Sequence, residues 1–199
     1  MKNNAKLRVI TSLKPSGDVK KQSHPKGSIL FHKGEAPSKE LSFLLSGTIG
    51  LIEINPNGDE SLLRVFGQND FIEYRSFLSG ERFHATAVAL SDVELSVFSF
   101  KDISEIQNRS PELLLHLTRV MANDLKAAEE RFIGVTGKRV LSRVIEALVF
   151  LKQRHPDYMW TRREIGDFCG TRTETVTRTL SALEEANLIH RDGRYIQAF

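Results

Sequence analysis

Hydrophobic and polar positions follow one pattern in the first half of this chain and another in the second half. Between residues 27 and 100, short apolar runs alternate with segments rich in Gly, Asn, Asp and Pro, at intervals of roughly 8–14 residues. This texture predicts antiparallel strands in a sandwich or barrel. The Asn57-Gly58 pair marks a hairpin, because both residues tolerate positive φ. Residues Met1–Lys26 are polar and Lys-rich, which predicts a loose lead-in with room for a short helix.

After Phe100 the apolar positions recur at helical spacing. A short helix is predicted at Lys101–Gln107, and Ser110-Pro111 then reads as an N-cap followed by Pro at the first helical position of a long helix ending near Gly134. The long helix carries a narrow apolar stripe between charged flanks: Leu114, Leu117, Met121, Leu125, Ala128, Phe132 and Val135. The stripe suits a two-stranded coiled coil, or else a helix lying on its own sandwich. Both can hold if the N-terminal half packs on the sandwich and the C-terminal half on a partner.

The segment Gly134–Gly137 is predicted to break this helix and to form a hinge. A further helix is predicted from Lys138 to about Arg154, ended by Pro156. We therefore expect three parts: an N-terminal domain over residues 1–110, a dimerisation helix with its hinge over 111–136, and a C-terminal domain over 137–199.

The C-terminal domain contains the signals of a helix-turn-helix. Thr161 and Glu164 have the T-x-x-E spacing of a capping box, which predicts a helix start. Ile165 and Phe168 share one face of this helix, and Gly170 can end it in the left-handed conformation. A second helix begins within two or three residues, where Thr171 and Glu174 suggest another capping box.

The second helix of this unit has an apolar face for packing and a polar outer face. Val176, Leu180 and Leu183 form the first; the second holds Thr173, Glu174, Thr177, Arg178 and Ser181. Such an outer face suits the DNA major groove, because Arg can bond guanine, Glu can accept from cytosine N4 and the Thr methyl can touch thymine. The alternative is that Glu174 and Arg178 simply form a surface ion pair.

The last segment predicts a small hairpin, or wing, beside the second helix. Asp192-Gly193 joins two short strand-like runs. His190, Arg191 and Arg194 on this wing could reach DNA phosphates.

Charge and composition agree with a DNA-binding reading. The formal net charge is +3, and residues 137–199 hold 11 Lys/Arg against 8 Asp/Glu, so the basic excess lies in the helix-turn-helix part.

One cysteine, Cys169, cannot build a disulfide framework, a zinc finger or an iron–sulfur cluster, and its position predicts a buried thiol. No signal peptide or membrane-length apolar run is apparent, so we expect a cytoplasmic protein without a membrane partner.

The sequence offers little to catalysis. It has no Ser-His-Asp arrangement, P-loop or dinucleotide fingerprint. His32 and His84 stand alone without an H-x-H pair, so no metal site and no enzyme is predicted.

The order of these parts resembles the cyclic-AMP receptor protein/FNR family of bacterial transcription regulators. The most specific segments are Thr161–Gly166, Gly170 and Glu174–Arg178, and the segments 27–35, 44–47 and 69–72 look like the family's β-roll turns. The resemblance implies an α+β fold: an N-terminal antiparallel β-roll, like a cyclic-nucleotide-binding jelly roll, then a long dimerisation helix and a C-terminal winged helix-turn-helix. It also implies a homodimer on double-stranded DNA, with RNA polymerase as a further partner.

The resemblance assigns roles within the DNA-binding helices. Glu174 and Arg178 become the base-reading pair for a central G·C. Thr173 stands where the cyclic-AMP branch has Arg, and Thr177 stands where the FNR branch has a small hydroxyl residue. The resemblance therefore implies a palindromic site nearer the FNR type, TTGA-like, than the cyclic-AMP type. Thr161 and Arg162 match phosphate-contacting positions. Arg172 stands where the family usually has Ser at the helix cap, so the expected cap moves to Thr171 and Arg172 becomes a phosphate contact, as does Arg194.

The ligand site departs from the resemblance. Cyclic-nucleotide binders of the family carry Gly-Glu and later Arg-Ser/Thr-Ala, whereas this chain has Glu73-Tyr74 and Phe83-His84 before Ala85. Without that Arg the cyclic phosphate loses a bidentate contact, so cyclic AMP is not expected and no cofactor is predicted. Candidate residues for a pocket with another, unknown effector are Tyr74, Arg75, Ser76, Arg82, His84, Ala85 and Thr86. The alternative is that Arg75, Arg82 and His84 are solvated rim charges.

A second function remains open at this point. The chain could be a β-roll effector-binding or protein-interaction module whose helix-turn-helix serves only for packing.

Overall fold

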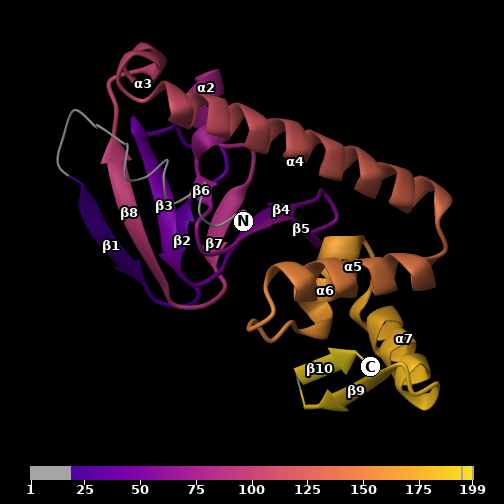
Figure 1. Cartoon of the computed structure of the whole chain (residues 1–199). Coiled ribbons are helices and arrows are strands. Elements are labelled where there is room, and N and C mark those ends of the chain that lie inside the picture. The colour runs from indigo at the N-terminus through magenta and orange to yellow at the C-terminus, as the bar shows by residue number, and fades with distance from the viewer. Residues whose placement is uncertain (1–18, 194, 199) are drawn as a thin grey trace. The chain divides into compact units, whose positions relative to one another are not determined.

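The computed structural model describes residues 19–193 and 195–198 of the chain (Figure 1). It forms two compact units. One comprises Met1–Glu53 with Arg64–Lys126, and the other Ile54–Leu63 with Ala127–Phe199. The predicted α+β class is confirmed, with two antiparallel sheets, a long helix and a C-terminal helix-turn-helix.

The first sheet of the β-roll has the order β1-β8-β3-β6, with antiparallel pairing throughout. Its strands are β1 (Lys20–His24), β8 (Val93–Ser99), β3 (Glu40–Ser46) and β6 (Phe71–Ile72). The prediction of a loose lead-in is wrong for β1. That strand is polar and almost wholly exposed, and it is defined by its register with β8, Lys20 opposite Val97, instead of by apolar burial.

The second sheet has the order β2-β7-β4-β5. Its strands are β2 (Ile29–Phe31), β7 (Thr86–Ala89), β4 (Ile49–Ile54) and β5 (Glu60–Phe66). The predicted hairpin joins β4 to β5. Gly58 has φ of 84° and donates its N–H to the carbonyl of Asn55 at 2.9 Å, and the Asn55 side chain accepts from the N–H groups of Asn57 and Asp59.

Two short helices belong to the β-roll. The sequence did not predict α2 (Tyr74–Ser79), which follows β6. The predicted helix after Phe100 is present as α3 (Ile103–Arg109), capped by Asp102, whose carboxylate accepts the N–H of Glu105 at 2.9 Å. The β-roll core includes the fully buried side chains of Leu41, Leu44, Ile49, Ile72, Leu95 and Ile106.

The long helix α4 runs over Pro111–Gly137 and begins with Pro111, as predicted. The predicted break over Gly134–Gly137 is present, but the helix ends three residues later than expected. It runs through Gly134 to Gly137, since one glycine in a helix costs only about 1 kcal/mol and does not end it. After it, α5 (Val140–Arg154) starts from Arg139, whose extended backbone redirects the chain.

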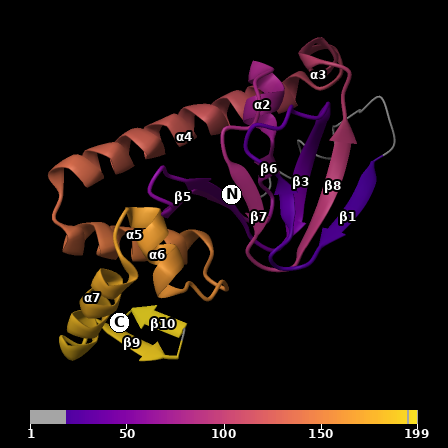
Figure 2. The same cartoon turned by 180° about the vertical axis from the view of Figure 1, so that it is seen from behind.

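The remaining elements form the C-terminal end of the second unit. They are α6 (Arg162–Cys169), α7 (Thr173–Glu185), β9 (Ile189–Asp192) and β10 (Tyr195–Ala198). Figure 2 shows β9 and β10 side by side next to α7. Together with α5 they enclose a core that contains Val144, Leu151, Trp160, Ile165, Val176 and Leu180, each at most 1% exposed. In the described part of the chain, no helix has the length and apolar character needed to cross a membrane.

Candidate nucleic-acid interface

The start of α6 is fixed by the predicted capping box. The Thr161 hydroxyl accepts the N–H of Glu164 at 3.2 Å, and the Glu164 carboxylate accepts the N–H of Thr161 at 2.7 Å. The other carboxylate oxygen of Glu164 accepts the Tyr158 hydroxyl at 2.6 Å. These contacts hold the helix start against the preceding loop.

The turn between α6 and α7 depends on two glycines. Gly170 has φ of 67° and, like Thr171, donates its N–H to the carbonyl of Gly166. A Cβ atom on Gly166 would lie 2.7 Å from the Thr171 carbonyl oxygen and 3.6 Å from a methyl group of Val176. The close approach of the two helices therefore requires glycine at position 166, a role that the sequence pattern did not reveal.

The predicted capping box of Thr171 and Glu174 is not formed. The N-cap of α7 is Arg172, without a side-chain cap bond, and its carbonyl accepts the N–H groups of Thr175 and Val176. Thr171 does not take this place, because its carbonyl oxygen lies against Gly166 of the preceding helix and its N–H bonds the Gly166 carbonyl. The Arg172 side chain is exposed.

The two faces of α7 separate as predicted. Val176 and Leu180 are fully buried, and Leu183 is half-buried. On the outer face, Thr173, Glu174 and Arg178 are exposed. Within the described residues, neither Glu174 nor Arg178 has a hydrogen-bond or ion-pair partner, so the alternative of a surface ion pair between them is wrong for this structure.

Thr177 is half-buried and differs from its neighbours on the outer face. Its hydroxyl donates to the carbonyl of Thr173 at 2.9 Å, within the same helix. The hydroxyl hydrogen is therefore occupied, which leaves the methyl group and the oxygen lone pairs for a base edge.

The side chains that were predicted to contact phosphates differ in whether they are exposed and free of other hydrogen bonds. Arg162 and Arg172 are exposed. The Thr161 hydroxyl is already engaged in the capping box, because it accepts the N–H of Glu164 and donates to the Glu164 carboxylate at 2.8 Å. Arg194 lies outside the described residues. On the wing, His190 is exposed, but Arg191 binds Glu184 of α7 instead of pointing freely outward.

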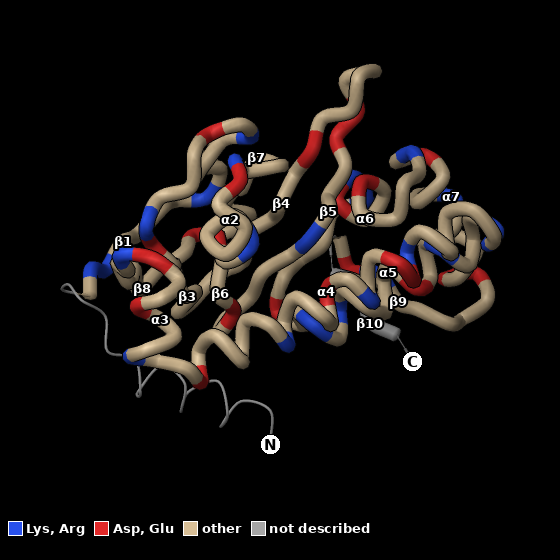
Figure 3. Tube along the Cα trace, turned by 90° about the horizontal axis from the view of Figure 1, so that it is seen from above, with Lys and Arg blue, Asp and Glu red and all other residues tan. Residues whose placement is uncertain are grey.

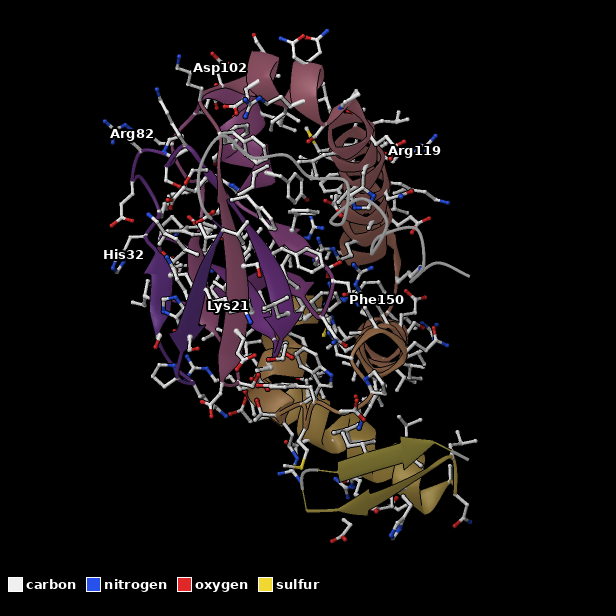
Figure 4. All side chains as sticks on the ribbon, turned by 60° about the vertical axis from the view of Figure 1, so that its left-hand side comes forward. Lys21, His32, Arg82, Asp102, Arg119 and Phe150 are labelled. Carbon is white, nitrogen blue, oxygen red and sulfur yellow. The ribbon has the colours of Figure 1, made fainter. Side chains whose placement is uncertain are left out.

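Aromatic side chains connect α6 of the helix-turn-helix to the preceding helix α5. Phe150, labelled on α5 in Figure 4, stacks on Phe168 with ring centroids 5.4 Å apart. Arg131 of α4 lies 5.1 Å from the centre of the same Phe168 ring and donates to the carbonyl of Leu63 at 2.5 Å. Sequence reasoning missed Arg131, because a charged residue in a helix normally indicates a solvated face.

Cys169 is buried, as predicted. Burial raises the pKa of its thiol to about 11, so it stays protonated and unreactive near neutral pH. Among the residues that the structure describes, no group of three or more His, Cys, Asp or Glu side chains could hold a metal ion.

The candidate effector residues of the β-roll divide into two groups. Tyr74, Ser76 and Ala85 are buried, and Thr86 is half-buried. Arg75, Arg82 and His84 are exposed, as the rim alternative required. The Arg75 guanidinium lies 3.3 Å from the His84 ring nitrogen, and Arg82 donates to the carbonyl of Gly34 at 2.8 Å. Partial desolvation of the His84 ring against its neighbours, followed by the nearby Arg75 charge, lowers the pKa of His84.

Buried Tyr74 contacts two residues that sequence reasoning did not select. Its hydroxyl donates to Asp124 of α4 and accepts from Arg64, the single basic residue of β5, marked in blue in Figure 3. Arg64 also pairs with Asp124. Strand β5 and helix α2, whose contacting residues are 10 positions apart, thus meet the much later helix α4 through polar side chains inside one unit.

Glu73, next to Tyr74, is held in an unusual state. Its backbone is left-handed, with φ of 69°, and its carboxylate accepts the Ser42 hydroxyl at 3.1 Å. Burial, with a smaller contribution from Glu40, raises the pKa of Glu73 to about 7, although the Ser42 hydrogen bond opposes the shift.

The apolar stripe of α4 changes environment along its length. Leu117 is fully buried and Leu114 half-buried, whereas Met121, Leu125, Ala128 and Phe132 are exposed, Phe132 at 70%. The N-terminal half of the stripe therefore packs inside the β-roll unit, and the C-terminal half presents an apolar surface.

Comparisons with known proteins match both parts of the chain. Family models describe residues 21–110 as a cyclic nucleotide-binding domain and residues 142–198 as a Crp-like helix-turn-helix domain. The cAMP-activated global transcriptional regulator CRP of Salmonella typhimurium is 30% identical over 185 residues, covering 88% of each chain. The fumarate and nitrate reduction regulatory protein of Vibrio cholerae is 24% identical, covering 89% of this chain and 74% of its own.

Solved structures share the fold. FixK2 from Bradyrhizobium japonicum superposes with a TM-score of 0.80 at 20% identity, covering 92% of this chain and 93% of its own. The c-di-GMP responsive global regulator CLP of Xanthomonas campestris superposes with a TM-score of 0.76 at 17% identity over 99% of both chains.

Proposed function

Because this chain belongs to the cyclic-AMP receptor protein/FNR family of transcription regulators and carries the family's helix-turn-helix, we propose that it binds a palindromic, TTGA-like DNA site as a homodimer. In this proposal each protomer inserts the outer face of α7 into a major groove. The two half-sites lie about one helical turn apart. RNA polymerase as a partner and a cytoplasmic location stay predictions.

The observation that carries the proposal is the outer face of α7. Glu174 and Arg178 are exposed on a helix whose opposite face is locked by Val176 and Leu180. Since the two charged groups do not bind each other, both remain available for base edges. Arg178 would bond guanine O6 and N7, and Glu174 would accept from cytosine N4.

Dimer formation is supported by the exposed half of the α4 stripe. Monomeric proteins rarely keep several large apolar side chains exposed in one row. A second copy of the same helix would cover Met121, Leu125 and Phe132 by coiled-coil packing.

Regulation through the β-roll is part of the proposal, with an effector other than cyclic AMP. Glu73-Tyr74 and Phe83-His84 replace the anchors for the ribose and the cyclic phosphate. Arg75 and His84, 3.3 Å apart, are the groups from which an anion site could be built. Adding cyclic AMP to the DNA-binding assay should therefore leave the affinity unchanged.

The test is selection of bound sequences from a random DNA library, followed by gel shifts over a salt series. We expect a palindrome, and affinity that falls as salt rises because phosphate contacts release counterions. Glu174→Ala and Arg178→Ala should each weaken binding by about 1–3 kcal/mol and relax preference at one base pair. Glu185→Ala on the same helix and Arg139→Ala before α5 are the matched controls. Unchanged site preference in both α7 variants would favour the packing-only alternative.

A further inference from the structure

The wing is tied to α7 by one carboxylate. Glu184 lies near the end of α7, and Arg191 lies on β9. The Arg191 backbone N–H donates to one oxygen of Glu184 at 3.0 Å, and its side-chain Nε donates to the other at 2.7 Å. Nη2 of Arg191 bonds that second oxygen as well and reaches the Ser181 hydroxyl at 3.4 Å. Both carboxylate oxygens are thus used by a single residue of the wing.

The strand alternation of β9 explains why Arg191 turns toward α7. Ile189 is buried, and Arg191 lies two residues later on the same face of the strand. His190 and Asp192 occupy the opposite, exposed face. Arg191 is accordingly only 18% exposed in its side chain, although it belongs to a surface hairpin.

The connection before β9 reinforces this arrangement. Asn187 takes a left-handed conformation with φ of 55°, and the N–H of Leu188 bonds the carbonyl of Leu183 at 2.9 Å. The turn sets where β9 begins, and the Glu184–Arg191 contact sets which face of the strand is turned toward α7. Hydrogen bonds from Arg191 lower the pKa of Glu184, which favours the ionised carboxylate that these bonds need.

We propose that Arg191 and Glu184 are positioning residues for DNA binding, which hold the wing so that its outer face, with His190, meets the DNA backbone. The proposal rests on the proposed function, since it assumes that α7 enters a groove. It also reassigns Arg191, whose charge the sequence pattern had offered to a phosphate. The Nε and Nη2 groups of the Arg191 guanidinium are engaged by Glu184 and Ser181, which leaves only Nη1, so a two-pronged contact with a phosphate would require Arg191 to release the carboxylate that holds the wing.

The experiment compares wild type with Arg191→Gln, Glu184→Gln and the double variant on the selected DNA site. We expect the two single variants to weaken binding by the same factor, on the order of threefold to tenfold, and the double variant to be no weaker than either, because both changes break one network. The slope of log affinity against log salt concentration should fall by the same amount in the two single variants. Glu185→Gln, which removes a neighbouring exposed charge, should behave as wild type.

Arg191→Lys separates positioning from direct contact. A lysine keeps the charge but lacks the guanidinium fork, so it should fail to restore binding if Arg191 positions the wing. Restored binding by Lys, or a salt slope reduced by about one in Arg191→Gln while Glu184→Gln keeps the wild-type slope, would mean that Arg191 contacts a phosphate. A loss of thermal stability with unchanged affinity and slope would mean that the pair is merely structural. Either result overturns the inference while wild-type binding stands, whereas absence of wild-type binding to any selected DNA would overturn the proposed function itself.

Discussion

Arg64 of β5 and Asp124 of α4 form an ion pair, although 60 residues separate them in the chain. The Arg64 guanidinium also lies 4.6 Å from the centre of the Phe66 ring and 5.3 Å from that of Tyr74. Aromatic faces and one carboxylate thus surround a cation whose side chain is 19% exposed. The β-roll holds α4 through its own side chains at this point.

Asp124→Asn should destabilise the protein because it removes the charge that compensates Arg64. We expect a loss of about 1–3 kcal/mol in the free energy of unfolding, less than for a fully buried pair, since Asp124 is partly exposed. Urea denaturation followed by circular dichroism measures the difference. Glu129→Gln, which removes an exposed charge from the same helix, is the control, and equal stability of the two variants would contradict a structural role for the pair.

Glu73→Gln should change how stability depends on pH. The pKa of Glu73 is about 7 in the folded protein and 4.5 in its ordinary state, so the folded state binds the proton more tightly. The protonated group therefore contributes its full share of the free energy of unfolding below pH 4.5. This contribution, at most about 3 kcal/mol, is lost as the pH rises through 7. Glutamine stays neutral and can still accept the Ser42 hydroxyl.

Thermal unfolding at pH 4 and pH 8 checks this prediction. The variant should gain stability relative to wild type at pH 8 and match it near pH 4 and below. Glu81→Gln, at an exposed position after α2, should leave the pH dependence unchanged. An unaltered pH profile in Glu73→Gln would show that the carboxyl group is not held protonated in the folded state.

The sequence predicted those features that depend on neighbours within one turn. The capping box of Thr161 and Glu164, the left-handed Gly170 and the two faces of α7 all follow from spacings of three or four residues. The polar strand β1 left no such signal, because its partner β8 lies about 70 residues away and supplies backbone hydrogen bonds instead of apolar contact.

The candidate sites show the same division. The N-cap of α7 is Arg172 instead of Thr171, because the close helix contact places the Thr171 carbonyl oxygen against Gly166, which is a tertiary effect. The contacts of Arg64, Arg131 and Arg191 were equally hidden. A charged side chain looks solvated in a sequence until the fold brings a carboxylate, a carbonyl or a ring to it.

Gly166→Ala should destabilise the helix-turn-helix. Its added methyl group would lie 2.7 Å from the Thr171 carbonyl oxygen, a backbone atom that cannot rotate away. Overpacking of this kind typically costs about 1–3 kcal/mol. Hydrogen exchange of α6 and α7 amides, together with thermal unfolding, measures the loss. Gly137→Ala, where a methyl group meets no atom within 4 Å, should be neutral or slightly stabilising.

Replacing Leu125 and Phe132 with Ser should convert the proposed dimer to a monomer. Leu125 is 62% and Phe132 70% exposed, and both lie on the C-terminal half of the α4 stripe, where a second copy would bury them. Light scattering after size exclusion gives the mass directly. Ile54→Ser is the matched control, because Ile54 is also 62% exposed but belongs to the β4–β5 hairpin and is not part of the stripe. Since a two-fold DNA site needs two recognition helices, the monomeric variant should also lose the palindromic preference and keep only weak half-site binding. A doubly substituted protein that retains the wild-type mass would place the dimer contact on another surface.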